Sequence, residues 1–562
     1  MRHFLLIAIL FTFLTSCEDW FKTGSSENKI LQIAVKEDPD AVINIDSVLN
    51  TISIAVKSTV PVNAITINLA VSPKSVVTPV SGTKLDFTNP VKYTVIAENG
   101  DKREYTISVN NLSGEKKIIS ASVATALTDI KYNAVVAANT VSILVPYGID
   151  LSKLKIDAVL SPGAVANPAF GTENNYSSPV VHTITAANGT KTAYTVTVTN
   201  SPQETAVRAV WVTNVASEVL FSEANLTAMV DKLAELNFNT ICVTAYNKSQ
   251  TLFPSQTLAA VLGVTPSETV IDGCRWGDVM GKLIEKAKAK NIKVIAWFEY
   301  GFASHYAGQS QPITDKKPQW VSKQQDGTQT VKNNFYWLNG FHPEVQKFLT
   351  DMIVECVTKY PDLAGIQGDD RLPALPAHAG YDDYTKQLYK TETGKDLPTN
   401  PTETAFFNWK AQKMTDYATS LYNAVKAARS TCLVTWAPSA RGWAKDNYLQ
   451  DWPQWVANGK ADWVSPQQYR NESQGLSSYS TLIDGDISAV FTTTALKRKY
   501  VPGMLVRNGG YLPTDAFLAK MIQHNRSKGV LNESTWFYEG VIPKQTVFKT
   551  LYSGKALFPT LN

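Results

Sequence analysis

Residues 363–371 read LAGIQGDDR, a short apolar run that ends in two adjacent aspartates and an arginine. Similar apolar runs recur along this part of the chain, at residues 208–215, 239–246, 293–302, 432–439, 461–469, 500–509 and 530–540. Helical patterns separate them; residues 278–291, for example, place their apolar side chains on one helix face. Strands that alternate with helices in this way predict a parallel sheet closed into a (β/α)8 TIM barrel. An open doubly wound sheet is the structural alternative, but no glycine-rich phosphate loop follows the first strand.

Acidic residues follow three of these predicted strands. Glu299 ends the third strand, Asp369 and Asp370 end the fourth, and Glu539 ends the eighth. In a TIM barrel the active site lies at the carboxyl ends of the strands. Glycoside hydrolysis needs two such carboxyl groups, because one protonates the leaving oxygen and the other attacks the sugar or activates water. The acids therefore predict a glycosidase site, with solvated loop acids as the alternative.

The two adjacent aspartates raise a question of direction. Side chains alternate along a strand, so Asp369 and Asp370 are expected to point opposite ways. One then faces the barrel mouth and the other braces a loop or an arginine, unless a bulge at Gly368 resets the phase. We assign Asp370, nearer the strand tip, as nucleophile or base and keep Asp369 as the second choice. Glu299 is assigned as the proton donor, because its apolar neighbours disfavour the charged form.

Polar and aromatic residues at the strand ends, and in one loop, are candidates for binding the substrate. They are Asn214, Tyr246, Asn247, Tyr300, Asn339, His342, Arg371, Trp436, Gln468, Tyr469, Arg470 and Glu539. The His342-Pro343 step also fits a plain helix start, and the strand tryptophans fit barrel core as well as sugar platforms. No residue spacing indicates a metal site, and no cofactor is expected.

The first part of the chain contains a repeat. YTVIAENGDKREYTISVN begins at Tyr93, and HTITAANGTKTAYTVTVT begins 89 residues later at His182. Both carry alternating β-branched residues around an Asn-Gly pair, which is a strong hairpin signal. Two β-sandwich modules are therefore predicted at residues 30–112 and 113–201, and they resemble the cadherin-like repeats of bacterial surface lipoproteins. A spacer role is favoured over carbohydrate binding.

The N-terminus reads MRHFLLIAILFTFLTSC, a basic start followed by an apolar run and small residues. The run is about half the ~20 residues needed to cross a bilayer, so residues 1–16 are predicted to be a secretory signal. LTSC resembles the lipobox of bacterial lipoproteins, which implies a lipidated Cys17 and a polar tether at residues 17–29. Export and lipid anchoring to the outer membrane, on its periplasmic or surface face, are expected. A plain signal peptide cut elsewhere is the alternative.

Charge and cysteine content exclude some classes of protein. The formal net charge is +4, and the basic residues are scattered, so no nucleic-acid partner is indicated. The cysteines after Cys17 are far apart without a CxxC spacing, which argues against a disulfide framework. The 13 Trp and 23 Tyr residues fit a sugar-binding cleft, although core packing uses the same side chains.

From about residue 206 to 545 the chain resembles the glycosyl hydrolase-like 10 family. The matching stretches are RAVWVTNVASEVLFS, LNFNTICVTAYN with LFPS, VIAWFEYGF, WLNGFHPEVQKFL, GIQGDDRLPALPAHAGYDDY and LQDWPQWVANGKADWVSPQQYR. The resemblance implies a (β/α)8 barrel at 206–545 that acts on glycan, followed by a C-terminal tail at 546–562. It also implies activity towards bacterial cell-wall glycan strands, the substrate characterised in this group.

The chain departs from the family pattern in three places. The family's Val-Asp-Gly before the strand-four motif is Leu363-Ala364-Gly365 here, so one acid is missing. The Asp-Asp pair is usually followed by His or Tyr, where Arg371 stands, and the family's Asn-Pro is Asn339-Gly340. The acid pair and Glu299 remain, so the catalytic assignment stands while Arg371 leaves the substrate open.

These observations predict a lipid-anchored glycoside hydrolase that cleaves a polysaccharide, with peptidoglycan glycan strands as the first candidate. A catalytically silent carbohydrate-binding lipoprotein is the alternative, and it is consistent with the altered strand-four motif. A purely structural adhesin leaves the acids at the strand ends unexplained. A separation of Glu299 from both aspartates beyond about 12 Å would favour the binding alternative, since it exceeds either hydrolytic geometry. The oligomeric state is not indicated.

Overall fold

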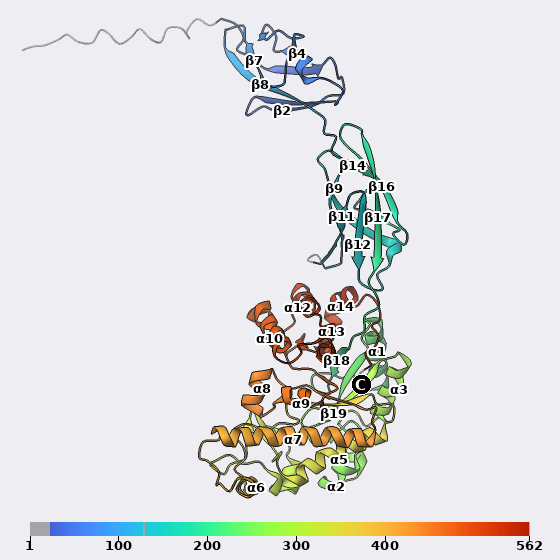
Figure 1. Cartoon of the computed structure of the whole chain (residues 1–562), viewed down its shortest axis with the longest axis vertical. Coiled ribbons are helices and arrows are strands. Elements are labelled where there is room, and N and C mark those ends of the chain that lie inside the picture. Colours follow the sequence, from blue (N-terminus) through green and yellow to red (C-terminus); the bar gives the residue numbers. More distant parts are fainter. Residues whose placement is uncertain (1–22, 128–129, 561–562) are drawn as a thin grey trace, which may run out of the picture. The chain divides into compact units, whose positions relative to one another are not determined.

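The computed structural model describes residues 23–127 and 130–560 (Figure 1). The chain forms two compact units, a strand-rich one that holds most residues up to Thr199 and a second one that holds the residues from Asn200 onward. The predicted signal peptide and Cys17 lie outside the described residues. Within the described ranges, no helix combines the length and the apolar character that crossing a membrane requires.

The first repeat consists of two sheets with a common core. One sheet contains β1 (Ile30–Val35), β4 (Ile65–Val71) and β6 (Lys84–Leu85); the other contains β2 (Val42–Asp46), β3 (Thr51–Val56), β8 (Lys102–Asn111), β7 (Val91–Ile96) and β5 (Val76–Thr78). Buried side chains from both sheets, such as Ile54 and Ile67, belong to one apolar cluster. The predicted alternation is observed in β3, where every second residue is buried.

The second repeat has the same organisation. Its sheets are formed by β10 (Lys131–Asn133), β9 (Ile118–Ala124), β13 (Leu154–Leu160) and β15 (Glu173–Asn174), and by β11 (Val135–Ala137), β12 (Thr140–Val145), β17 (Lys191–Asn200), β16 (Val180–Thr185) and β14 (Val165–Asn167). Both predicted hairpins are confirmed: Gly100 and Gly189 turn the chain at φ +88° and +82°. Only glycine adopts such angles without steric cost.

The second unit is built on eight parallel strands: β18 (Arg208–Val212), β19 (Thr240–Asn247), β21 (Lys293–Phe298), β25 (Gly365–Gly368), β26 (Leu433–Trp436), β27 (Trp463–Val464), β28 (Gly503–Leu505) and β29 (Glu533–Trp536). They lie side by side in chain order, and β18 pairs with both β19 and β29. Parallel bridges from Val464 to Tyr500 and from Gln467 to Gly503 connect β27 to β28. The sheet therefore returns on itself, which confirms a TIM-barrel-like fold.

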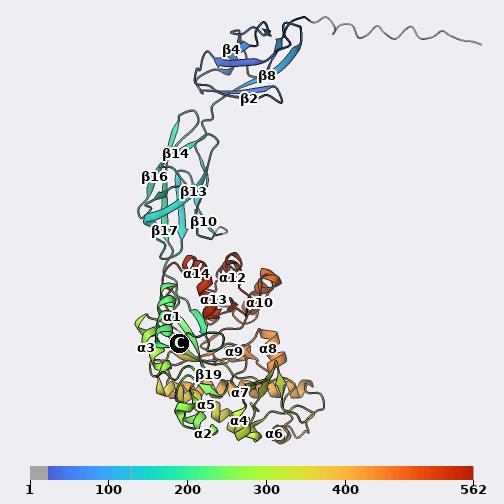
Figure 2. The same cartoon turned by 180° about the vertical axis from the view of Figure 1, so that it is seen from behind.

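Helices surround these strands in both views (Figures 1 and 2). They are α1 (Glu223–Glu235), α2 (Gln256–Leu262), α3 (Val279–Ala289), α4 (Pro312–Lys316), α5 (Pro343–Lys359), α6 (Asp383–Thr393), α7 (Thr404–Ala428), α8 (Arg441–Tyr448), α9 (Trp452–Ala457), α10 (Gly475–Ala489), α11 (Thr494–Lys497), α12 (Asp515–Ser527), α13 (Tyr538–Val541) and α14 (Gln545–Leu551). The face predicted for residues 278–291 is confirmed, because α3 buries all five of the apolar side chains that form it.

The end of the barrel needs a correction. The sequence suggested a tail at 546–562, but α14 buries Val547, Phe548 and Leu551. The ring of Phe548 packs against Phe238 with the centroids 5.0 Å apart. Further on, Leu557 pairs with Thr205 just before β18. The barrel therefore extends beyond residue 545, because its last helix supplies apolar surface to the shell.

Several strands end earlier than their sequences suggested. Leu372 N–H donates to the carbonyl of Asp369 at 3.0 Å, so a turn follows β25 directly after Gly368. Pro466, which has no N–H to offer a neighbouring strand, closely follows β27. Tyr538 and Glu539 lie in α13 rather than at the end of β29. These early endings change which side chains face the barrel mouth.

A small antiparallel sheet is inserted after β21. Its strands lie in the order β22 (Ala303–Tyr306), β24 (Phe335–Trp337) and β23 (Val331–Lys332). Asn333 and Asn334 connect β23 to β24 with φ of 51° and 63°. Two residues at positive φ form the tight hairpin turn that asparagine favours. A second short strand, β20 (Gln250–Thr251), pairs with the end of β19.

Candidate active site

Arg371 lies among the acids at the strand ends. Its Nη2 atom is 2.5 Å from Asp369 Oδ2 and 3.6 Å from Glu299 Oε1, and its Nη1 atom is 2.9 Å from Asp370 Oδ1. Because one nitrogen atom contacts both Asp369 and Glu299, the contacting oxygens of these two residues lie within about 6 Å of each other, a separation compatible with glycosidase carboxyl pairs. The three acids that the sequence pointed to therefore converge.

The expected separation of Asp369 from Asp370 is wrong. Both carboxyl groups contact Arg371, Asp369 at Nη2 and Asp370 at Nη1. The alternation argument fails because β25 ends at Gly368, so the two aspartates stand in a turn and not on a strand. Adjacent residues in a turn are free to point to the same side.

Asparagines at the ends of two neighbouring strands position Glu299. Asn247 Nδ2 donates to Glu299 Oε2 at 2.9 Å and to Asn214 Oδ1 at 2.7 Å. The main-chain carbonyl of Glu299 accepts from Arg371 Nε at 3.0 Å. Both asparagines were among the predicted substrate-binding residues, and the structure places them directly beside the acid.

Two glutamines position Asp369, whose side chain is only 2% exposed. Gln467 Nε2 donates to Asp369 Oδ1 at 3.0 Å, and Gln450 Nε2 donates to the Asp369 carbonyl at 3.0 Å. Sequence reasoning selected Gln468 instead of Gln467. The polar pair after strand six was the correct signal, but the side-chain direction was misjudged by one residue.

Burial and mutual repulsion shift the protonation of this cluster. Burial raises the pKa of Glu299 above its ordinary value, and Arg371 and the hydrogen bond from Asn247 only partly oppose this. Burial also raises the pKa of Asp369 well above its ordinary value, and the charge of Asp370 raises it further. Burial therefore favours the protonated forms of Glu299 and Asp369, while Asp370 lies 2.9 Å from Arg371 Nη1. Such a cluster offers more than one carboxyl group for acid–base chemistry.

Gly301 allows the loops after β21 and β25 to approach each other. Its φ is +52°, and a Cβ atom there would overlap the carbonyl oxygen of Arg371 and lie 2.5 Å from Leu372 Cβ. The next residue, Phe302, donates its N–H to the same carbonyl at 2.9 Å. Glycine at this position therefore keeps Glu299 and Arg371 within reach of each other.

Replacing Gly301 by alanine is expected to lower the free energy of unfolding by about 1–3 kcal/mol, because the methyl group adds a steric overlap to an unfavourable φ. Any glycan-cleaving activity should fall with it, since Glu299 and Arg371 move apart. Gly442→Ala is the control, because a Cβ on Gly442 meets nothing within 4 Å. Chemical denaturation of both variants checks the expectation; equal stability would contradict it.

Aromatic rings border the acids. The guanidinium carbon of Arg371 lies 4.6 Å from the centroid of Phe335 and 5.9 Å from that of Tyr300. Burial raises the pKa of Tyr469, and the charges of Asp369 and Asp370 raise it further, which places this hydroxyl near the pair. Tyr300 and Tyr469 were predicted site residues, whereas Phe335 was not singled out.

Among the tryptophans on the described strands of the barrel, Trp536 is partly exposed and the others are buried. Trp211, Trp297 and Trp436 are fully buried, and the Trp436 indole N–H donates to the carbonyl of Lys460 at 2.8 Å. Trp436 is therefore barrel core, which corrects its assignment to the substrate. Trp536 is half-buried and packs against Tyr469, with the centroids 5.9 Å apart. It is a candidate contact for substrate, in line with the sugar-platform alternative that the sequence left open for the strand tryptophans.

Several other predicted substrate residues have structural roles. Tyr246 is fully buried, and Asn339, 1% exposed, donates to Asp382 and Thr385 within a buried loop network. His342 caps α5 by accepting from the N–H of Glu344 at 3.2 Å, so the helix-start interpretation is confirmed. The remaining three bond elsewhere: Gln468 to Asp486, Arg470 to the Tyr469 carbonyl, and Glu539 to Ser217.

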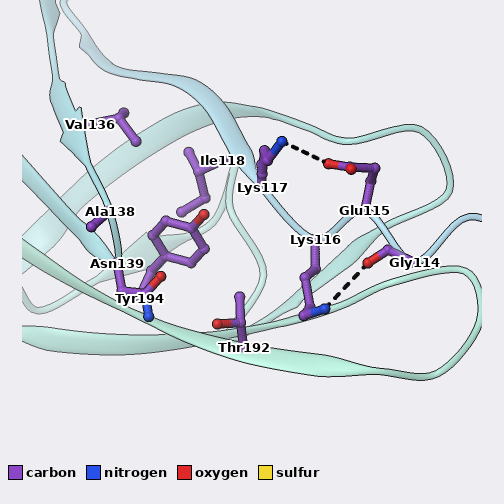
Figure 3. Close-up of a pocket in the computed structure, with 10 residues that line it drawn as sticks. All are labelled: Gly114, Glu115, Lys116, Lys117, Ile118, Val136, Ala138, Asn139, Thr192 and Tyr194. Atoms are coloured by element: carbon purple, nitrogen blue, oxygen red, sulfur yellow. Dashed lines mark hydrogen bonds and ion pairs between the residues drawn. The ribbon is translucent and has the colours of Figure 1, made fainter.

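A cavity of about 520 Å³ lies in the second repeat. Figure 3 shows the ring of Tyr194 beside Ile118, with Lys116 bonded to the carbonyl of Gly114 and Lys117 paired with Glu115 at 3.1 Å. Its lining contains one carboxyl group, and a lysine neutralises it. This cavity therefore lacks the pair of carboxyl groups that glycoside hydrolysis uses.

Metal ligation is not indicated in the described ranges, where no group of three or more His, Cys, Asp or Glu side chains is arranged to hold an ion. The four cysteines after residue 17 are free and buried. Burial raises the pKa of Cys274 to about 12, so this thiol stays protonated. Cys242 and Cys432 are small buried side chains.

A TIM-barrel-like fold with carboxyl groups gathered at its strand ends defines a glycosidase-like, carbohydrate-active class of protein. The chain belongs to the glycosyl hydrolase-like 10 family, whose model matches residues 206–495. The model described as "SGBP, N-terminal" matches twice, at residues 30–109 and 119–198. These two matches coincide with the two repeats.

One curated relative is the glycosyl hydrolase YngK of Bacillus subtilis (strain 168), 22% identical over 321 residues. The match covers 51% of this chain and 58% of that protein. Among solved structures, the PgaB (BpsB) glycoside hydrolase domain of Bordetella bronchiseptica is 14% identical over 62% of this chain and 100% of that one, with a TM-score of 0.46. The catalytic domain of a Paenibacillus polymyxa beta-amylase is 9% identical over 62% and 95%, with a TM-score of 0.42.

Proposed function

We propose that this protein is a glycoside hydrolase that cleaves a polysaccharide with two carboxyl groups. The observation that carries the proposal is the convergence of Glu299, Asp369 and Asp370 on Arg371. Family membership supports it, because glycosidic bonds are the bonds that such a pair of carboxyl groups breaks.

The residues divide the chemistry between them. Glu299 holds a proton because burial raises its pKa, so it donates to the leaving oxygen. Asp370 carries negative charge opposite Arg371 Nη1 and attacks the anomeric carbon or activates a water. Asp369 Oδ2 lies 2.5 Å from Arg371 Nη2 and holds the guanidinium opposite Asp370. Asn247 holds the Glu299 carboxyl at 2.9 Å, which keeps the donor oriented.

Bacterial cell-wall glycan strands are the proposed substrate, since this is the activity that the family resemblance implies. The test incubates the wild-type protein with peptidoglycan sacculi and with a panel of soluble polysaccharides. New reducing ends are expected from the sacculi or from one member of the panel. No product from any of them would contradict the proposal.

The second candidate function is a carbohydrate-binding protein without catalysis. One observation favours it: Arg371, in the place where the family usually has His or Tyr, contacts all three acids. A guanidinium among carboxyl groups lowers their pKa values and opposes a proton donor. Binding of glycan without release of reducing ends would support this candidate over the first.

We also propose that the protein is lipid-anchored through Cys17 on the outer membrane, which rests on the LTSC motif that follows the apolar N-terminal run. Cys17→Ala is expected to move the protein from the membrane fraction to the soluble fraction, because no lipid is attached. Fractionation of cells that express the two forms is the measurement. Membrane partitioning of the variant equal to that of the wild type would contradict the anchor.

A further inference from the structure

Two exposed aromatic side chains lie beside the hairpin of β23 and β24. Among residues 200–560, Tyr306 and Trp443 are the exposed aromatic residues, at 37% and 44%. Large aromatic surface is normally buried because its exposure to water costs free energy. Both exposed rings contact residues of the hairpin, which suggests that the two rings serve one function together.

Tyr306 is connected to the acids through Phe335. It ends β22 and lies opposite Phe335 in the register of the small sheet, with the ring centroids 5.1 Å apart. Its hydroxyl accepts from Asn334 Nδ2 at 3.1 Å. The Phe335 ring also packs against Tyr300, with the centroids 5.3 Å apart, and lies 4.6 Å from the Arg371 guanidinium carbon. The exposed Tyr306 ring is therefore one side chain away from the residue that binds all three acids.

Trp443 is connected to the acids through Tyr448. The two rings of α8 pack edge to face at 5.1 Å, and Lys332 Nζ lies 5.9 Å from the centroid of Trp443. The hydroxyl of Tyr448 accepts from Asn333 Nδ2 at 2.9 Å, which ties α8 to the tip of the hairpin. The charge of Asp370 raises the pKa of this hydroxyl, and the charge of Arg371 lowers it.

The order of the strands places these two routes on opposite sides of β24. Strand β24, which carries Phe335, lies between β22 with Tyr306 and β23 with Lys332. The outer strands of three are about 10 Å apart, which exceeds the length of one sugar ring. A ligand that covers both exposed rings therefore crosses the strand whose Phe335 contacts Arg371.

We propose that Tyr306 and Trp443 are sugar-binding platforms on the two sides of β24, so that the protein binds an extended glycan chain next to the acid cluster. The apolar face of a sugar ring packs on an aromatic ring, while Asn334 and Lys332 offer donors to its hydroxyl groups. A chain that spans both rings is bound along its length, which favours cleavage within chains over cleavage at their ends. This last point rests on the proposed hydrolase function.

The experiment measures binding in a Glu299→Gln background, so that no substrate is consumed. Long glycan strands and single disaccharide units, both prepared from peptidoglycan sacculi, are the probes, together with a panel of neutral polysaccharides. Trp443→Ala and Tyr306→Ala are each expected to weaken binding of the long strands about tenfold, a typical loss for an aromatic anchor. Tyr306→Phe keeps the ring and should stay within about twofold. Tyr147→Ala is the control, since this tyrosine is 38% exposed and lies in the second repeat.

The proposal is overturned if both alanine variants bind the long strands as tightly as the background does, or if the background binds none of the probes. Wild-type turnover is measured separately. If the protein binds glycan through the two rings but releases no product, the platform proposal stands and the hydrolase proposal is contradicted. If the wild type releases product while both alanine variants bind normally, the hydrolase proposal stands and the platform proposal is contradicted.

Discussion

Glu299→Gln and Asp370→Asn are each expected to lower turnover at least about a hundredfold, because acid–base assistance is typically worth 10²–10⁴-fold. Glutamine still accepts the hydrogen bond from Asn247 but has no acidic proton for the leaving oxygen. Asparagine at 370 lacks the negative charge needed for attack or for activation of water. Initial rates of reducing-end release, on whichever glycan proves active, are the measurement.

Asp369→Asn is the matched control for this prediction. An amide still accepts from Gln467, but its nitrogen replaces the oxygen that accepts from Arg371 Nη2, so the loss should be smaller in rate and larger in stability. Thermal melts of all three variants separate lost chemistry from lost folding. If Asp369→Asn abolishes activity while Asp370→Asn is nearly normal, the roles of the two aspartates are exchanged. If none of the three changes the rate, the proton donor and the nucleophile lie elsewhere.

Arg371→Met is expected to lower the free energy of unfolding of the barrel by about 3–5 kcal/mol at neutral pH, the usual cost of leaving a buried charge without its partner. The Arg371 side chain is only 13% exposed and contacts three carboxyl groups. Methionine fills much of the same space, so the loss reflects charge more than volume. Tryptophan fluorescence during denaturation is a suitable probe, since every tryptophan except Trp20 lies in the barrel.

The stability of this variant should depend on pH in a definite direction. Without Arg371, the pKa of the buried carboxyl groups rises further above the unfolded value of about 4. The native state then binds more protons than the unfolded state, so stability decreases as pH rises from about 5 to 7 and recovers on acidification. Lys248→Met is the control, because Lys248 lowers the pKa of Glu299 more weakly than Arg371 does. A variant as stable as the wild type at both pH values would contradict the central role of Arg371.

The features that the sequence predicted well are those set by local periodicity. The buried face of α3 follows from the spacing of its apolar residues, and the two Asn-Gly hairpins follow from the φ angles that glycine allows. The order of the barrel strands also follows, because βαβ units place successive parallel strands side by side. Glu299 was found for the same reason, since it comes directly after a buried strand.

The features that the sequence predicted badly depend on where each strand stops. Side-chain direction along a strand has a period of two, so an error of one residue exchanges Gln467 for Gln468 and misplaces Asp369 relative to Asp370. Tyr448 and Phe335 reach the acids from a helix and an inserted sheet, which no periodicity in the strands reveals. Asn339 looked like a site residue because it is polar beside a strand, but the loop turns it into the core.

The pairing of Leu557 with Thr205 has a consequence for how the barrel is joined to other segments. Leu557 is hydrogen-bonded to both neighbours of Thr205. Ala206 N–H donates to the Leu557 carbonyl at 2.9 Å, and Leu557 N–H donates to the Glu204 carbonyl at 2.8 Å. Entry and exit of the chain therefore meet at the amino-terminal ends of the strands, opposite the acids. Such a barrel is suited to circular permutation, with the old ends joined by a short link and new ends opened in a surface loop.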